Sequence, residues 1–411
     1  MEGLGFESFN GLRGRMGDWL RLPNRSCLAE KTSGGLPMSK TEEHVERLCV
    51  GVDLHKTQFT VCAVLEDSEI VLEEVYKTTE EGYKAFSDKM HEAEETRGCS
   101  VELAIETTGN ARFFKNRMEA EGFGVVVVNT NKFKVITMST KKNDANDAAT
   151  LAFYLYKEML PEAHLCDQTS EEIRRMLKTR TILVRTSVRI KNQIHGMMLG
   201  YGIETKATQL QSKKKRQELF NDLANHEFSK FTAPSLKMML DILDNLAVQI
   251  NKIEKQLLEM TKEDEDVPLL MTVPGIGIIG ATTIASYTKD LDRFGGDFRR
   301  FASYLGIVPS VHNSNETVHL GKITKHGPVE LRTAFVQVAL GMVRLPKVTE
   351  KWRLLIDYKL MKTDKGSGRA IIALTRKVAR IVFTMLHTRE PFNPSLMIRE
   401  LKKPQKELVG A

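Results

Sequence analysis

Two predicted strands of this chain end on carboxylates whose positions suggest chemistry. The apolar residues Cys49 to Val52 predict a buried strand, and it ends on Asp53. The apolar residues Val101 to Ile105 predict a second strand, and it ends on Glu106. A charge at the end of a buried strand needs a partner, such as a metal ion or a cationic side chain. Both carboxylates are therefore candidate site residues.

Two further carboxylates lie on one face of a predicted helix. The apolar spacing predicts a helix over residues 143–157, in which Asp144 and Asp147 are three residues apart. Four converging carboxylates repel one another unless they surround hard divalent cations such as Mg²⁺ or Mn²⁺. Two such ions about 4 Å apart can activate and stabilise oxygens in phosphoryl transfer. Taken singly, Asp53 could be a strand-end turn residue and Asp144 a helix N-cap.

Strands and helices must position these carboxylates between Leu48 and about His164. The order predicts a mixed sheet with helices on its faces, in which strand ends gather functional groups at one edge. Lys141 and Lys142 precede the Asp144 helix, where they could neutralise a phosphate backbone or simply belong to a solvated loop. The expected strands after the first are 58–65, 70–77, 101–106 and 125–128, and the expected helices are 79–93, 111–121 and 143–157.

Two long heptad patterns follow and predict a pair of helices that form a coiled coil. Thr169 and Glu172 have the spacing of a capping box ahead of the first helix, which extends to Tyr201. Arg180 interrupts its apolar heptad. The second helix repeats the heptad more strictly over residues 239–260.

One face of the first long helix is basic. Its cations recur at steps of three or four residues and are accompanied by no acid; they are Arg174, Lys178, Arg185 and Arg189. A charged stripe is usually a solvated face, but solvated faces usually mix signs. We therefore expect this stripe to contact nucleic acid.

The C-terminal part opens with a glycine-rich turn between two short predicted helices. Gly275 and Gly277 lie in this turn, and a hairpin of this kind leaves backbone N–H groups pointing outward at a helix N-terminus. The predicted helix-hairpin-helix is a sequence-independent phosphate cradle, although a plain glycine C-cap is the alternative.

A later loop rich in hydroxyl groups could present a nucleophile to a phosphodiester. Its flanking cations are Lys322, Lys325 and Arg332. Chemistry alone does not choose among Ser310, Ser314 and Thr317.

Composition bounds the classes of protein to which this chain can belong. Its 411 residues suffice for two or three domains, and no apolar run approaches the roughly 20 residues of a membrane span. The net charge of +7 permits a nucleic-acid partner without demanding one. The five cysteines show no paired spacing, so we expect a cytoplasmic protein with neither a disulfide framework nor a zinc site.

The ordered motifs resemble those of the DEDD transposases of bacterial insertion sequences, the IS one-ten family, which includes Piv-type DNA invertases. The motifs are GVDLHK, IETTGN, KKNDANDAA, VPGIG, GIVPS and LGKITKHG, and the resemblance covers about Leu48 to Asn393. It implies a ribonuclease H-like N-terminal domain, like that of Holliday-junction resolvases. It also carries the family's four metal-binding carboxylates onto Asp53, Glu106, Asp144 and Asp147.

The resemblance further implies a C-terminal transposase domain with a nucleophilic serine in a Ser-Ser-Gly-Gly-like loop. Counting from Pro309 to Gly321, that loop falls on residues 313–316, where Ser314 is the only serine. Both glycines of the family pattern are replaced, and Glu316 adds a negative charge. Members of the family are understood to be guided by a structured noncoding RNA, which would give the basic stripe an RNA partner.

These expectations combine into an α/β plus α protein that acts as a metal-dependent DNA recombinase with a serine nucleophile. The alternatives are a structure-selective nuclease that uses water, and an inactive nucleic-acid-binding relative. We expect DNA and a guide RNA as partners, a homo-oligomer through the coiled coil, no membrane, and a bacterial, nucleoid-associated location. The expected segments are a disordered extension (1–45, with Met38 as a candidate start), the carboxylate domain (46–165), the coiled-coil insertion (166–262), the C-terminal domain (263–400) and a tail (401–411).

Overall fold

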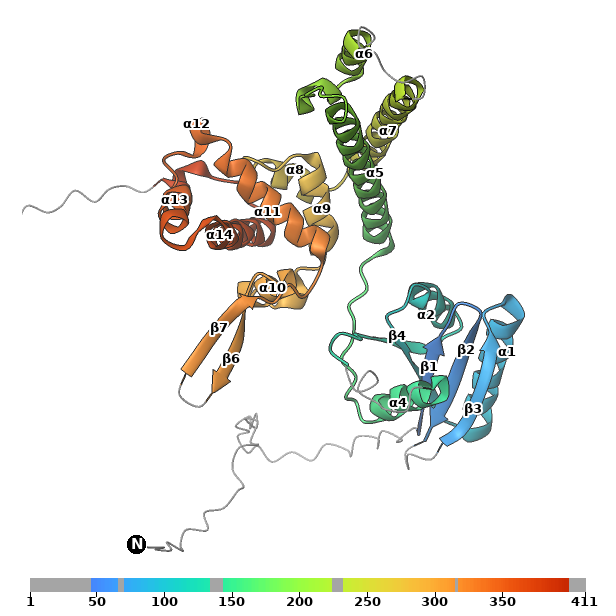
Figure 1. The fold of residues 1–411 in the computed structure, drawn as a ribbon. Coiled ribbons are helices and arrows are strands. Elements are labelled where there is room, and N and C mark those ends of the chain that lie inside the picture. Colours follow the sequence, from blue (N-terminus) through green and yellow to red (C-terminus); the bar gives the residue numbers. More distant parts are fainter. Residues whose placement is uncertain (1–45, 66–69, 134–142, 224–231, 315–316, 399–411) are drawn as a thin grey trace, which may run out of the picture. The chain divides into compact units, whose positions relative to one another are not determined.

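The computed structural model describes residues 46–398, apart from residues 66–69, 134–142, 224–231 and 315–316 (Figure 1). The predictions for residues 1–45, for Lys141 and Lys142, and for the C-terminal tail lie outside this description. The chain divides into two compact units, one up to Ala163 and one from His164 onward. Among the described helices, none is long and apolar enough to cross a bilayer.

A mixed sheet forms the centre of the first unit. Its strands run in the order β3-β2-β1-β4-β5, with antiparallel pairing of β1 to β2 and β2 to β3, and parallel pairing of β1 to β4 and β4 to β5. Because β1 and β4 are parallel, with Val52 opposite Ile105, Asp53 and Glu106 lie at the same edge. The predicted mixed sheet is confirmed. The strands are β1 (Arg47–Leu54), β2 (Gln58–Val64), β3 (Ile70–Lys77), β4 (Ser100–Glu106) and β5 (Gly124–Val128).

Helices pack on both faces of this sheet. Phe59 of β2 stacks on Tyr83 of α1 and meets Phe114 of α2 edge-on. Cys62, on the opposite face of β2, packs against Ala148 of α4. The helices are α1 (Glu80–Arg97), α2 (Ala111–Ala120) and α4 (Asp144–Tyr156).

Gly51 allows α4 to lie directly on β1. A Cβ atom at this position would stand 1.9 Å from the carbonyl oxygen of Ala148, so a larger residue does not fit. Alternate residues of a strand share a face, so Asp53 lies on the same face of β1 as Gly51. The first turn of α4 carries Asp144 and Asp147. The strand therefore directs Asp53 towards the helix that holds the other two aspartates.

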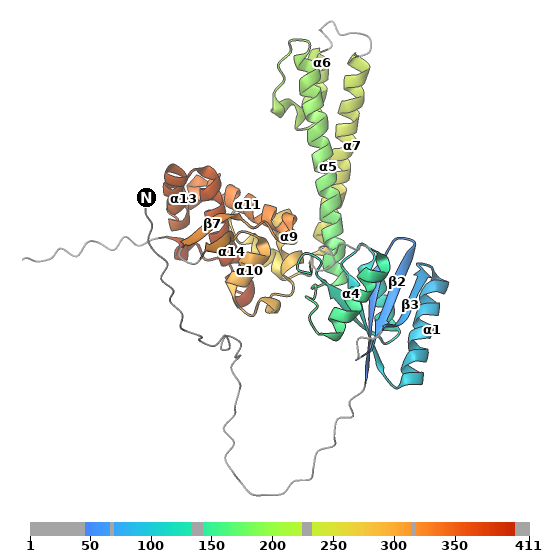
Figure 2. The same ribbon diagram turned by 60° about the horizontal axis from the view of Figure 1, so that its bottom comes forward.

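The second unit begins with two long helices, α5 (Gln168–Leu199) and α7 (Thr232–Met260), which lie side by side (Figure 2). They are antiparallel, because Leu177 near the start of α5 packs with Leu257 near the end of α7, whereas Ile194 packs with Leu240. The connection contains η1 (Ala207–Leu210) and α6 (Lys213–Leu223).

The structure corrects the predicted start of the first long helix and explains the interruption of its heptad. The helix begins earlier than its capping-box spacing indicates: Asp167 is the N-cap, and its side chain accepts a hydrogen bond from the amide of Ser170 at 2.8 Å. Arg180 interrupts the heptad because its Nε donates to Glu254 of α7 at 2.7 Å.

The rest of the second unit is mostly helical, as predicted. Its core includes Phe301, which meets Phe335 edge-on and stacks on Phe383. The elements are α8 (Asp266–Met271), α9 (Ile278–Thr288), η2 (Asp292–Phe294), α10 (Phe298–Leu305), β6 (Pro309–Ser314), β7 (Thr317–Ile323), α11 (Val329–Val343), α12 (Pro346–Thr349), α13 (Arg353–Lys365), α14 (Ser367–Thr388) and η3 (Pro394–Met397).

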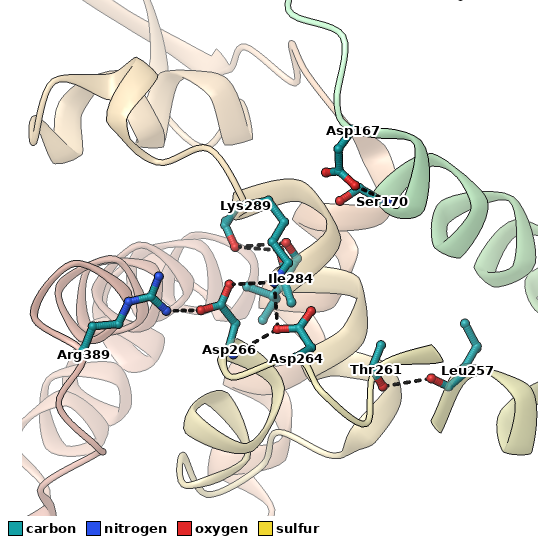
Figure 3. Close-up of polar contacts among 11 residues, drawn as sticks. Asp167, Ser170, Leu257, Thr261, Asp264, Asp266, Ile284, Lys289 and Arg389 are labelled. Carbon is teal, nitrogen blue, oxygen red and sulfur yellow. Dashed lines mark hydrogen bonds and ion pairs between the residues drawn. The ribbon is translucent and has the colours of Figure 1, made fainter. Parts of the chain in front are cut away.

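Ion pairs tie together the helices that follow the coiled coil (Figure 3). Asp266, at the start of α8, has a side chain that is 6% exposed, and it pairs with Arg389 and with Lys289. The ammonium nitrogen of Lys289 also lies 2.9 Å from a carboxylate oxygen of Asp264. The buried Asp266 carboxylate is thus compensated by two cations, as a buried charge requires. These contacts therefore fix α8 against the ends of α9 and α14.

The contact of α4 with β1 gives a stability prediction. Gly51→Ala should destabilise the first unit by ~1–3 kcal/mol, because the new Cβ would overlap the backbone of α4. Urea unfolding followed by circular dichroism measures this loss. The matched control is Gly109→Ala, since a Cβ there meets no atom within 4 Å. If both variants unfold like the wild type, α4 does not approach β1 as described.

Candidate active site

Asp53, His55 and Asp144 meet at the edge of the sheet. His55 Nε2 lies 3.0 Å from Asp53 Oδ2 and 3.4 Å from Asp144 Oδ2. Each of the three residues offers one ligand atom, and these atoms all lie within 4.8 Å of one another. Asp53 is largely buried, whereas His55 and Asp144 are about half exposed. The group is therefore open to an ion or a substrate.

The electrostatics link Glu106 and Asp147 to the same group. Burial raises the pKa of Glu106, and the negative charges of Asp53 and Asp147 raise it further. Burial also raises the pKa of Asp53; the His55 side chain opposes this shift, while the charges of Asp144 and Asp147 add to it. The structure thus brings the four predicted carboxylates close enough to repel one another.

The loop after β4 holds the end of β1 in position. The side-chain amide of Asn110 donates to the carbonyl oxygen of His55 at 3.2 Å, and Thr108 Oγ1 donates to Asn110 Oδ1 at 2.8 Å. Thr107 Oγ1 donates to the carbonyl of Val128, at the end of β5, at 2.6 Å. The IETTGN motif therefore connects the carboxyl ends of three strands around Glu106.

The start of α4 is fixed by its own cap. Asn143 is the N-cap, and its side chain accepts a hydrogen bond from the amide of Ala145 at 3.3 Å. Because Asn143 already caps the helix, Asp144 does not need to, which removes the capping alternative considered for Asp144.

His55 is the site residue that sequence reasoning missed. It stands two residues after Asp53, and residues at i and i+2 of an extended chain point to the same side. That spacing was the available signal, but a lone histidine after a strand is not specific. Its contact with Asp144 depends on α4, which is distant in sequence.

The donor set fits a divalent cation. Carboxylate oxygens are the ligands of hard cations, and an imidazole nitrogen is accepted by several divalent metals. The raised pKa values of Asp53 and Glu106 reflect burial together with mutual repulsion, and a bound cation would relieve the repulsion. The acidic group at this edge of the sheet thus suggests a divalent metal.

Ser314 is the last residue of β6 and pairs with Thr317 of β7 at the tip of a hairpin. The predicted loop is therefore shorter than expected, since Ser314 belongs to a strand and only residues 315–316 separate the two strands. Ser310 lies at the other end of the hairpin, where its Oγ would be 2.3 Å from a Cβ at Gly321.

Two glycines let the base of this hairpin cross the end of α10. A Cβ at Gly306 would stand 2.2 Å from the carbonyl oxygen of His326, and one at Gly327 would stand 1.8 Å from that of Tyr304. Both have positive φ, as does Lys325, with φ 55°. The side chains of Lys322 and Lys325 are exposed beside this crossing.

The predicted basic contacts divide into free and engaged side chains. Lys178, Arg185 and Arg189 are exposed on α5 and make no ion pair within the described residues. Arg174 instead lies 3.9 Å from the Tyr287 ring centroid, and its Nε donates to the Ser286 carbonyl at 3.0 Å. Arg332 is engaged in a similar way, because it donates to the carbonyl oxygen of Leu305 at 3.1 Å. Arg174 and Arg332 are therefore engaged within the protein.

The glycine-rich turn packs against α11 and leaves the N-terminus of α9 exposed. A Cβ at Gly275, whose φ is 96°, would approach the backbone of Met342 and Val338 to 3.2 Å. Gly277 is exposed and is the N-cap of α9. The turn thus joins two helices, α8 and α9, as predicted, with Gly275 serving the packing and Gly277 lying at the open end.

Two family models match the chain. The DEDD model of the IS110 type, described as a transposase, matches residues 50–203, which include the carboxylate group. A second model, described as the transposase IS116/IS110/IS902 family, matches residues 267–353, which include the hairpin.

Curated relatives agree with these models. The transposase for insertion sequence element IS1111A of Coxiella burnetii is 26% identical over 84% of this chain and 90% of its own length. A probable family 20 transposase of Pseudomonas aeruginosa is 25% identical over 71% of this chain and 86% of its own length. The transposase for element IS1328 of Yersinia enterocolitica is 26% identical, over 69% and 83%. Since the two models cover both units and the relatives align along most of their length, this chain belongs to the IS110 family of insertion-sequence transposases.

Proposed function

We propose that this transposase cuts and joins DNA with a divalent metal ion, Mg²⁺ or Mn²⁺, and the hydroxyl group of Ser314. Asp53, Glu106, Asp144 and Asp147 would hold the ion. The observation that carries the proposal is the approach of these four carboxylates at one edge of the sheet, where burial and mutual repulsion raise the pKa of two of them.

The fold of the first unit, in this proposal, is ribonuclease H-like. Two features support it: the strand order β3-β2-β1-β4-β5, and the change from antiparallel to parallel pairing at β1. The α8–α9 turn is proposed as a helix-hairpin-helix, with the exposed N-terminus of α9 facing a phosphate.

The bound ion would supply positive charge and Lewis acidity at the scissile phosphate. The residues of this chain bind and orient it. His55, when its Nε2 carries a proton, donates to Asp53 Oδ2 and, with Asp144 Oδ2 only 3.4 Å away, holds the two aspartates together.

Ser314 would attack the phosphorus. A bond forms between Oγ and phosphorus, the bond from phosphorus to the leaving sugar oxygen breaks, and the serine proton reaches that oxygen; the product is a phosphoserine link. Ser314 is proposed because it is the only serine in the segment that corresponds to the family's serine loop. Its backbone pairs with Thr317 at the end of β6, next to the point where the two strands of the hairpin are joined.

The nucleic-acid partners follow from charge. Lys178, Arg185 and Arg189 on α5 would contact a phosphate backbone, with Lys322 and Lys325 near the serine hairpin. A structured guide RNA is the proposed partner of the α5 stripe, and the coiled coil the proposed site of homo-oligomer formation. Replacement of both loop glycines and the presence of Glu316 favour one alternative, a nuclease in which the carboxylates activate water without a covalent step.

The carboxylates give the first test of function. Asp53→Asn, Glu106→Gln, Asp144→Asn and Asp147→Asn should each lower strand exchange by at least ~100-fold, a loss expected for metal ligands. Mn²⁺ at 100 times its dissociation constant should stabilise the wild type by about 2.7 kcal/mol in thermal unfolding and the variants by much less. Asp88→Asn removes an exposed carboxylate of α1 and should keep both properties. If a variant kept wild-type activity, the replaced carboxylate would not be a metal ligand.

The raised pKa values also predict how stability depends on pH. The folded protein binds protons at Asp53 and Glu106 more readily than the unfolded chain, so metal-free stability should fall as pH rises through and above the usual carboxyl range. Asp53→Asn should flatten this dependence. Urea midpoints between pH 4 and pH 7 measure it, and an unchanged curve for the variant would contradict the coupling.

The serine assignment is tested by trapping the covalent intermediate. Ser314→Ala should remove the protein–DNA adduct and the recombined product while DNA and metal binding persist. Ser310→Ala is the matched control and should retain activity. A denaturing gel with labelled donor DNA, with and without protease, detects the adduct. Adduct in Ser314→Ala but not in Ser310→Ala would move the nucleophile, and cleavage without any adduct would favour the nuclease.

The α5 stripe is tested by salt dependence. The triple variant Lys178→Gln, Arg185→Gln, Arg189→Gln should reduce the slope of log K against log salt by about 0.7–0.9 for each lost contact. A control with the same charge change is Lys213→Gln, Lys214→Gln, Lys215→Gln on α6. Filter binding with a labelled structured RNA and with a labelled duplex shows which one is bound. Equal slopes for the two triple variants would mean that the α5 stripe is only a solvated face.

A further inference from the structure

Helix α14 carries a second basic stripe that is separate from the positions assigned above. Arg369, Arg376 and Arg380 are spaced by seven and four residues, which puts them on one face of a helix. The 22-residue helix contains no aspartate or glutamate. A face that carries three arginines and no acid over residues 369–380 is unlike the mixed charges of an ordinary solvated helix.

The three arginines are available to a ligand. Arg369 and Arg380 are exposed and Arg376 is partly exposed, and none makes an ion pair with the described residues. The neighbouring Lys377, by contrast, lies off the stripe, and its ammonium nitrogen is 2.5 Å from Asp357. The three arginines therefore have no ion-pair partner among the described residues, while the adjacent lysine is paired with Asp357 at the surface.

The last arginine of the stripe contacts α10, the helix that leads into the serine hairpin. The Arg380 guanidinium lies 4.8 Å from the ring centroid of Phe298, which packs on Phe383 of α14. The acid that caps α10, Asp297, is paired with Arg299. The aromatic contact orders the Arg380 side chain, so it loses less entropy on binding.

We infer that the α14 stripe of Arg369, Arg376 and Arg380 binds the backbone of the DNA duplex on which the transposase acts. From Arg369 to Arg380 the stripe spans about 17 Å at 1.5 Å per residue. A duplex presents one phosphate charge per about 1.7 Å of its axis, so several phosphates face the stripe at once. Duplex DNA is the chosen partner because α10 connects this face directly to the hairpin that carries Ser314.

The closing experiment compares two neighbouring cations of one helix. Fluorescence anisotropy of the full-length protein with a labelled 30-base-pair duplex is recorded at several KCl concentrations in EDTA, so that neither the metal site nor Ser314 affects the result. Arg376→Gln should lower the slope of log K against log salt by about 0.9, and Lys377→Gln should leave it unchanged. The triple variant Arg369→Gln, Arg376→Gln, Arg380→Gln should lower it by about 2.7.

The same variants serve as a control for folding and distinguish duplex DNA from RNA as the partner. Thermal unfolding should match the wild type for each, since these side chains lie outside the core. The inference fails if Arg376→Gln and Lys377→Gln have equal effects, or if the triple variant loses affinity for a labelled RNA hairpin but not for the duplex. Because the readout is binding without metal, such a failure would leave the proposals for the carboxylates and for Ser314 untouched.

Discussion

The close contact between α4 and Gly51 of β1 is the constraint on which the carboxylate group depends. It brings a helix backbone to within contact distance of a strand backbone, a separation that any side chain at this position would prevent. The parallel pairing of β1 with β4 sets Asp53 and Glu106 at the same edge, and the helix contact adds Asp144 and Asp147. Charge repulsion opposes this arrangement, and the packing of α4 on the sheet holds it.

Backbone contacts through glycine recur in the second unit. Gly306 and Gly327 allow two segments to cross at the base of the hairpin, and Gly275 lies against Gly341 of α11. In each case the side chains on either side belong to a motif that the sequence makes visible. The glycines of these motifs therefore serve close packing.

Helix α9 connects the coiled coil to the C-terminal helices. Arg174 of α5 stacks on Tyr287 near its end, and Lys289 joins its end to Asp264 and Asp266. Burial raises the pKa of Tyr287 to about 12, so the ring under Arg174 remains an uncharged phenol. The coiled coil is thus anchored by Arg174, which the sequence analysis predicted to contact nucleic acid, and by Tyr287 and Lys289, for which it predicted no role. The end of α5 that contacts α9 is therefore fixed in position, and a nucleic acid on the exposed part of α5 would bind a helix held at that end.

Local patterns determined much of this protein from the sequence alone. Apolar runs predicted the strands that end on Asp53 and Glu106, heptads predicted α5 and α7, and the three-residue spacing put Asp144 and Asp147 on one face. These features depend on residues near one another in the chain, so their periods can be read directly. The motif order also identified the family.

Only the tertiary structure decided which of these residues meet and which are already engaged. His55 joins the carboxylates because α4 folds back over β1, and Arg174 and Arg332 are used within the protein because Ser286 and Leu305 approach them. Two further features differ from the prediction: the N-cap of α5 is Asp167, and Ser314 lies in a strand instead of a loop. Such contacts join residues far apart in sequence, and no local period encodes them.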